Sequence, residues 1–438
     1  MTHAVDNQIG WELRNSKDKM TSLKKNFSWT LVGNAIYAGC QWGMLVVLAK
    51  LGSPQVVGQF ALASAIITPV IMITNMQLRG VQATDAKKEY FFSDYMAVRI
   101  ASTVVALSIV LLILCVGHFK KIVFLATLVL ALAKSVESLS DVFYGLFQQH
   151  EKMSVIAKSM IIKGVLSVVV LGSVFYFSLS LPWSLFGLLC AWMVVLALYD
   201  WQMGRRLLET VEDISHRSLA KLSFFSFLDR RTILFRIIVL AFPLGIVMGI
   251  ISLNANIPNY AIAKYLGSRD LGIFAALAYT TVVVNMFIQA LGQVVVPRMA
   301  RHFADNDIPA FRELLKRMIF INLTIGLLGV LIISIGGEKI LSLIYTHEYA
   351  AYSNLFIVLM ISATLSGVAS ALGYAMTAAR QFNLQVPLFL TVLVATFLIS
   401  LLLIPYFKLY GAAMALIVSA LIQIVGGAFI VRRAVRSN

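Results

Sequence analysis

Three charged side chains within one apolar stretch are the first candidates for chemistry. Lys134, Glu137 and Asp141 stand at i, i+3 and i+7 within residues 122–147, which places them along one helix face. A charge inside a membrane span costs roughly 3 kcal/mol, so such groups turn toward protein or water and pair. This face predicts a cavity lining in which Lys134 meets an anionic ligand and Glu137 or Asp141 serves gating or ion coupling. The alternative is an ion pair between Lys134 and Glu137 that only joins helices.

Four arginines lie close to the ends of other apolar stretches. Arg79 follows the second stretch and Arg298 follows the eighth, at matching places in the two halves of the chain. Two fixed guanidinium groups suit a diphosphate, because each donates in a bidentate geometry. Arg99 and Arg380 are similar candidates for substrate binding. All four also fit a purely topological role at the cytoplasmic side.

Two further polar groups stand inside apolar stretches. Lys163 lies in the fifth stretch, where we expect either a pair with Asp141 or a stem that extends to the interface. Asn256 lies between Asn254 and Asn259 in the seventh stretch. These amides would meet sugar hydroxyls in a substrate or hydrogen-bond between helices.

The composition defines the environment that these residues occupy. Of the 438 residues, 60% are hydrophobic and 13% are charged, and the mean hydropathy is +0.86. This excludes a water-soluble fold. About twelve stretches are long enough to cross the hydrocarbon layer as helices, each of roughly 20 apolar residues, and none alternates like a barrel strand. The fold class is therefore an all-α polytopic membrane protein.

The basic residues indicate its orientation. The chain carries 36 Lys and Arg against 20 Asp and Glu, a net charge of +16. The basic residues concentrate in every second loop, which predicts that both termini lie in the cytoplasm. A nucleic-acid surface would gather them on one soluble face, so no nucleic-acid partner is expected. The location expected is the bacterial cytoplasmic membrane.

A repeated string divides the chain into two halves. Residues 49–53 read AKLGS and precede Gly58, and residues 263–268 read AKYLGS and precede Gly272. Repeats of this kind indicate a transporter with its substrate path between two lobes. We expect a polar cytoplasmic N-terminus (1–26), an N-lobe (27–203), a linker with an amphipathic helix (204–236), a C-lobe (237–431) and a basic tail (432–438).

Together with this repeat, the string NMQLRGVQATD at residues 75–85 and the pair Pro297-Arg298 resemble the polysaccharide transporter family. That family includes the Wzx-type O-antigen flippases and belongs to the multidrug, oligosaccharidyl-lipid and polysaccharide exporter superfamily. The resemblance implies two six-helix lobes in a V around a central cavity. It also implies alternating access that carries an undecaprenyl-diphosphate-linked oligosaccharide across the membrane.

The expected partners are that lipid-linked oligosaccharide, membrane lipids, and a polysaccharide polymerase with its chain-length machinery. No cofactor or metal is expected, and coupling to protons or sodium ions stays open. A cation-coupled multidrug exporter is one alternative, although the first two stretches contain no Asp or Glu. A membrane-embedded polysaccharide-assembly enzyme is another. It is disfavoured because the sequence offers no nucleophile with a base, no phosphate-binding glycine loop and no metal-ligand spacing.

Overall fold

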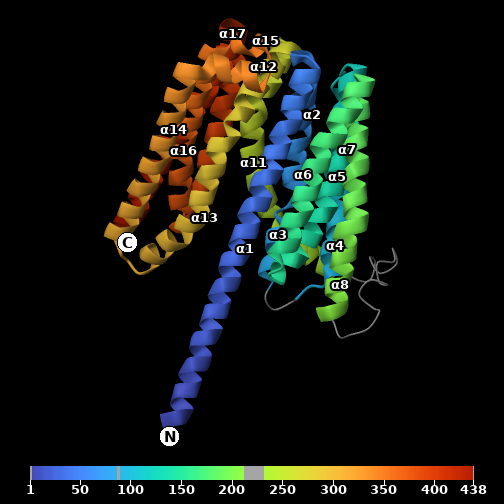
Figure 1. Ribbon diagram of the computed structural model, residues 1–438. Coiled ribbons are helices and arrows are strands. Elements are labelled where there is room, and N and C mark those ends of the chain that lie inside the picture. Colours follow the sequence, from blue (N-terminus) through green and yellow to red (C-terminus); the bar gives the residue numbers. More distant parts are fainter. Residues whose placement is uncertain (1, 86–88, 212–230, 438) are drawn as a thin grey trace.

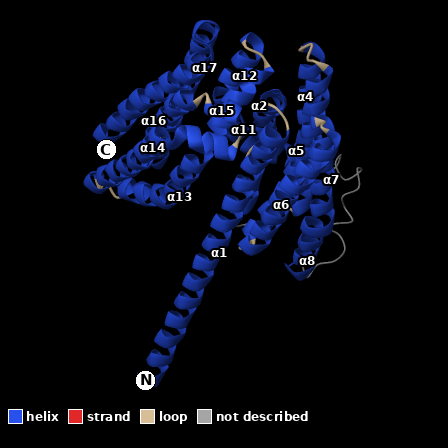
Figure 2. Ribbon diagram, turned by 45° about the horizontal axis from the view of Figure 1, so that its top comes forward, coloured by secondary structure: helices blue, strands red, loops and turns tan. Residues whose placement is uncertain are grey.

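The computed structural model describes residues 2–85, 89–211 and 231–437, and every regular element within them is helical (Figure 2). In chain order the elements are α1 (Thr2–Leu51), α2 (Pro54–Asn75), α3 (Leu78–Thr84), α4 (Phe92–Val116), α5 (Lys121–Gln149), α6 (Met153–Ser178), α7 (Leu181–Val195), the π-helix η1 (Leu196–Asp200), α8 (Trp201–Val211), α11 (Arg231–Tyr265), α12 (Ser268–Thr280), α13 (Val282–Ala304), α14 (Ile308–Ile344), α15 (His347–Ala350), α16 (Ser353–Ala378) and α17 (Phe382–Ser437).

Ten helical segments in the described part of the chain are long and apolar enough to cross a membrane. The predicted eighth span is divided at Thr281 into α12 and α13. The predicted eleventh and twelfth spans both lie in α17, where Lys408 has a non-helical backbone (φ 52°, ψ −131°). The all-α polytopic fold is confirmed, and the count of twelve stays a prediction.

The helices form two lobes. Helices α1 to α8 make the first lobe, in which α1 packs along α6, and α11 to α17 make the second, in which α16 packs against α14 and α17. The lobes meet where α11 and α12 pack against α2, and the other long helices of the second lobe diverge from the first lobe toward the end that carries both termini (Figure 1). The polar segment expected at 1–26 continues the first span as helix from Thr2. The amphipathic helix expected around 219–228 lies outside the described residues.

The closed end of the V depends on a glycine crossing between α2 and α12. A Cβ built on Gly58 would lie 1.7 Å from the carbonyl oxygen of Ser268, and one on Gly272 would lie 1.7 Å from that of Pro54. Only a residue without Cβ allows backbones to approach so closely. These glycines are the equivalent positions of the repeated string, so the two copies of the repeat pack against each other.

Hydrogen bonds strengthen the same end. Trp42 of α1 donates to the hydroxyl of Tyr345 at 3.0 Å, and that hydroxyl donates to the carbonyl oxygen of Ala276 in α12 at 2.8 Å. The hydroxyl of Tyr260 in α11 donates to the carbonyl oxygen of Ala65 in α2. The first lobe is therefore tied to the second by polar contacts from two helices as well as by the glycine crossing.

We expect Gly58→Ala to open this end, because the new methyl group meets a backbone carbonyl that cannot move alone. The distance between spin labels at Leu51 and Tyr265, both exposed at the ends of their helices, should increase in a variant without native cysteines. Gly39→Ala is the matched control, since no atom lies within 4 Å of its Cβ position. Identical distance distributions in both variants would contradict this account of the closed end.

Candidate functional site

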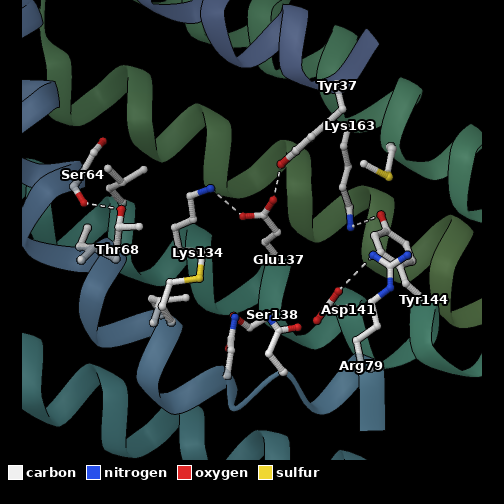
Figure 3. A pocket seen from close by; sticks show the side chains of 18 of the residues that line it. Tyr37, Ser64, Thr68, Arg79, Lys134, Glu137, Ser138, Asp141, Tyr144 and Lys163 are labelled. Carbon is white, nitrogen blue, oxygen red and sulfur yellow. Dashed lines mark hydrogen bonds and ion pairs between the residues drawn. The ribbon is translucent and has the colours of Figure 1, made fainter. Parts of the chain in front are cut away.

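A cavity of about 580 Å³ lies within the first lobe. Its walls come from α1, α2, α3, α5 and α6, and Gln77, one of the two residues between α2 and α3, also contributes. The polar lining residues are Tyr37, Ser64, Thr68, Asn75, Gln77, Arg79, Lys134, Glu137, Ser138, Asp141, Tyr144, Gln148 and Lys163. Figure 3 shows Arg79 of α3 and Lys163 of α6 on either side of the charged residues of α5.

Helix α5 supplies the longest polar wall. Lys134 Nζ lies 2.7 Å from Glu137 Oε2 and 5.2 Å from the centre of the Trp192 ring. The Tyr37 hydroxyl donates to Glu137 Oε1. The ion pair expected as the alternative therefore exists, but both partners also line the cavity, with exposed side-chain fractions of 32% and 26%.

Asp141 bridges two arginines. Arg79 NH1 lies 3.5 Å from Asp141 Oδ1, and Arg99 NH2 lies 3.5 Å from Asp141 Oδ2. Arg79 also donates to Gln148 Oε1 at 3.0 Å and stands over the Tyr144 ring, 5.4 Å from its centre. Arg99 is fully buried behind Asp141, so of the two arginines only Arg79 reaches the cavity.

A break between α2 and α3 positions both arginines. Met76 and Gln77 have φ values of 50° and 51°, in the left-handed region that non-glycine residues rarely adopt. The chain turns there, so Leu78 begins a new short helix beside α5, with Arg79 in its first turn. Arg99 NH1 donates to the side-chain and carbonyl oxygens of Asn75, which satisfies the carbonyl oxygen of the last residue of α2 in place of water.

The predicted pair between Lys163 and Asp141 is wrong. Lys163 Nζ lies 2.9 Å from Asp200 Oδ2, and both side chains are at most 1% exposed. Lys163 also donates to the Tyr144 hydroxyl at 3.1 Å, and Ser159 donates to Asp200 Oδ1 at 2.5 Å. Asp200 ends η1, and the wider π-helical turn changes the direction in which its side chain points.

Three predicted substrate residues lie away from this cavity. Arg298 on α13 and Arg380, which follows α16, are exposed. Asn256 on α11 is half-buried, donates to the Ser252 carbonyl oxygen at 2.8 Å and accepts from Asn259. The structure thus brings Arg79, Lys134, Lys163, Glu137 and Asp141 together, with Arg99 behind them, and leaves the second-lobe candidates elsewhere.

Four residues of the site were missed in the sequence, and the pattern could have identified most of them. Tyr144 and Gln148 extend the face of Glu137 and Asp141 by one and two further helical turns. Asp200 is an acid inside the sixth predicted stretch, which by itself required a partner. Tyr37 carried no distinguishing signal, because a tyrosine in an apolar span is common.

The donor set defines what this cavity can bind. Ammonium, guanidinium and hydroxyl groups face the space and match phosphate and sugar oxygens. Lys134 and Lys163 each face one carboxylate, whereas Asp141 is shared by Arg79 and Arg99, so the cluster has one cation in excess. The described residues contain no group of three or more His, Cys, Asp or Glu that could hold a metal ion.

Solved structures of membrane transporters share the two-lobed architecture. An inward-facing multidrug resistance MATE family transporter of the MOP superfamily has a TM-score of 0.72, with 12% identity over 93% of this chain and 99% of the other. The lipid II flippase MurJ in an inward closed conformation has a TM-score of 0.67, with 13% identity over 92% and 87%.

Sequence comparison identifies the family. The model for "Polysaccharide biosynthesis protein" matches residues 23–303, and the model for "Lipid II flippase MurJ" matches residues 217–438. The chain belongs to the polysaccharide biosynthesis protein family, and it is a multi-pass membrane transporter rather than an enzyme. The capsular polysaccharide biosynthesis protein CapF of Staphylococcus aureus is 26% identical over 94% of this chain and all of the relative. The predicted superfamily is confirmed.

Asp200→Asn should strongly destabilise the protein, because it leaves the buried Lys163 ammonium without a counter-charge. Removing one partner of a buried ion pair costs about 3–5 kcal/mol. The loss should appear as a lower midpoint of thermal unfolding in lipid nanodiscs. Glu209→Gln is the matched control, since its pair with Arg205 is 56% and 64% exposed and such pairs contribute below about 1 kcal/mol. Equal midpoints for the two variants would refute the assignment.

Proposed function

We propose that this protein is a flippase that moves an undecaprenyl-diphosphate-linked oligosaccharide, a repeat unit of O-antigen or another surface polysaccharide, across the bacterial cytoplasmic membrane. The observation that carries the proposal is the first-lobe cavity, in which Arg79 and Lys134 present cationic donors to the space. Its family and its resemblance to the CapF protein support this class of substrate.

The chemistry of the cavity suits the head of such a lipid. A diphosphate prefers fixed arginine and lysine donors, and sugar hydroxyls match the tyrosine, serine and glutamine groups of the same wall. About 580 Å³ is typical of a site for a small ligand. It would hold the diphosphate and its first sugar, while the rest of the oligosaccharide extends into the space between the lobes.

A multidrug exporter for cations is the second candidate, because Glu137 and Asp141 line the cavity. In this structure both carboxylates already bind cations of the protein itself, at 2.7 Å for Glu137 and 3.5 Å for Asp141. A cationic drug would have to displace Lys134 or Arg79 from them. An anionic ligand would likewise have to replace a carboxylate, but the cluster has four cations for three carboxylates, and this excess of positive charge favours the anionic substrate.

Other parts of the proposal concern residues outside this cavity. Arg298, Arg380 and Asn256 would contact the substrate in a different conformation, when the second lobe takes part in the path.

Transport would be coupled to protons or sodium ions through Glu137 or Asp141, or would run without coupling. A polymerase and its chain-length machinery would receive the substrate.

The test is complementation of a bacterial strain that lacks its own flippase but makes the same repeat unit. Wild type should restore surface polysaccharide, whereas Arg79→Gln and Lys134→Gln should reduce it about tenfold or more, as expected when a charged ligand loses a charge-assisted hydrogen bond. Arg205→Gln, an exposed change on α8, is the control at equal membrane expression. Arg298→Gln and Arg380→Gln belong in the same series.

The outcomes separate the candidates. Full activity of both cavity variants would reject the cationic path. Resistance to cationic drugs conferred by wild type, without restored polysaccharide, would favour the multidrug exporter instead.

A further inference from the structure

The bridge formed by Asp141 has a property that the other ion pairs of the cavity lack. Its two contacts are 3.5 Å long, against 2.7 Å for Lys134 with Glu137 and 2.9 Å for Lys163 with Asp200. Charge-assisted hydrogen bonds are strongest near 2.7–2.9 Å and weaken toward 3.5 Å. Of the two, the Arg99 contact has hydrogen-bond geometry, so the Arg79 contact is the loosest of the pairs that a ligand in the cavity can reach.

The two arginines differ in what else they can bind. Arg79 is 31% exposed and lies on the cavity wall, where Gln148 and Tyr144 hold it in place without neutralising its charge. Arg99 is fully buried and is fixed to Asn75 by two hydrogen bonds. A ligand can take Arg79 away from Asp141, but it cannot reach Arg99.

We propose that Asp141 is an internal competitor of the substrate phosphate and that Arg99 is the positioning residue that keeps it in place. This inference rests on the proposed function, because it requires an anionic ligand at Arg79. Without a ligand, Asp141 is shared between Arg79 and Arg99. An incoming phosphate oxygen replaces the carboxylate on Arg79, and Asp141 stays within reach because Arg99 holds its other oxygen.

The consequence concerns release. A cavity with unopposed arginine and lysine charges would bind a diphosphate tightly and hold it. A carboxylate fixed beside Arg79 lowers the net affinity and re-forms its own contact as the phosphate leaves. Asp141 thereby lowers the affinity for the phosphate and speeds its release. A flippase requires this release because it must give up its ligand on the far side of the membrane.

The position of Arg99 connects this event to the helix break. Its guanidinium holds Asn75, directly before the left-handed residues Met76 and Gln77. Gly245 of α11 packs there: a Cβ built on it would lie 2.4 Å from the Ile73 carbonyl oxygen and 3.1 Å from the Cα of Met76. Arg99, which holds Asp141, thus also holds the end of α2, where α2 packs against α11 of the second lobe.

The experiment measures binding and flipping separately, with undecaprenyl diphosphate as the probe and the full chain in lipid. Asp141→Asn should bind the probe about tenfold more tightly, equivalent to ~1.4 kcal/mol, and should flip a fluorescent form of it more slowly in proteoliposomes. A purely structural ion pair predicts that binding and flipping both weaken. Binding that is unchanged or weaker in Asp141→Asn would overturn the inference.

Two further variants keep the test decisive. Residue 99 does not touch the ligand, and a lysine there cannot bind both Asp141 and Asn75 as the guanidinium does. Arg99→Lys should therefore bind the probe more tightly and flip it more slowly, to a smaller degree than Asp141→Asn. This variant keeps the test valid even if Asp141→Asn fails to fold. Weaker binding in Arg99→Lys would reject its positioning role. Glu209→Gln removes an arginine-paired carboxylate far from the cavity and should change neither measurement.

Arg79→Gln tests the foundation independently. If wild type and Arg79→Gln bind undecaprenyl diphosphate equally well, the proposed function fails at this site and the competitor has nothing to compete with. If Arg79→Gln loses binding while Asp141→Asn shows no gain, the substrate site stands and only the inference about Asp141 falls.

Discussion

The crossing of α2 and α12 at Gly58 and Gly272 is the constraint on which the arrangement of the lobes depends. Each glycine lies where any side chain would overlap a carbonyl oxygen of the other helix, so the two backbones are in direct contact at one end of the molecule. The lobes also meet along α2 and α11, and the other long helices of the second lobe stand apart from the first toward the end that carries both termini (Figure 1). The glycines do not make this contact alone, because residues of both lobes, among them Val57 of the first and Ile262 and Phe274 of the second, belong to one buried apolar cluster.

The repeat was visible in the sequence, but its role required three dimensions. The strings before Gly58 and Gly272 predicted two lobes, and the structure adds that the copies touch each other. The symmetry suggested by Arg79 and Arg298 does not extend to their surroundings. In the first lobe the helix ends at Asn75, and the turn that follows directs Arg79 toward the cavity. In the second lobe the helix is interrupted at Thr281 instead. Helix α13 then continues through Pro297, and Arg298 is exposed.

Periodicity likewise predicted one helix face and failed to predict its partners. The spacing of Lys134, Glu137 and Asp141 correctly indicated a polar stripe along α5, because positions on one helix are fixed by its geometry. Which neighbouring helix faces each position depends on how the other helices are rotated and on local breaks such as η1. For this reason Lys163 was assigned to Asp141, whereas the π-helical turn brings Asp200 to it.

The paired charges would allow the anion site of the proposed function to exist in a membrane protein that must work empty as well as loaded. An unpaired arginine or lysine in a span is costly, and more so when the cavity closes and loses its water. Glu137, Asp141 and Asp200 balance all but one of the four cations of the cluster. In the proposed flippase, the return step without substrate would then involve one net positive charge in this cluster rather than four. The acids that suggested a cation exporter are thus as necessary to an anion carrier as its basic residues.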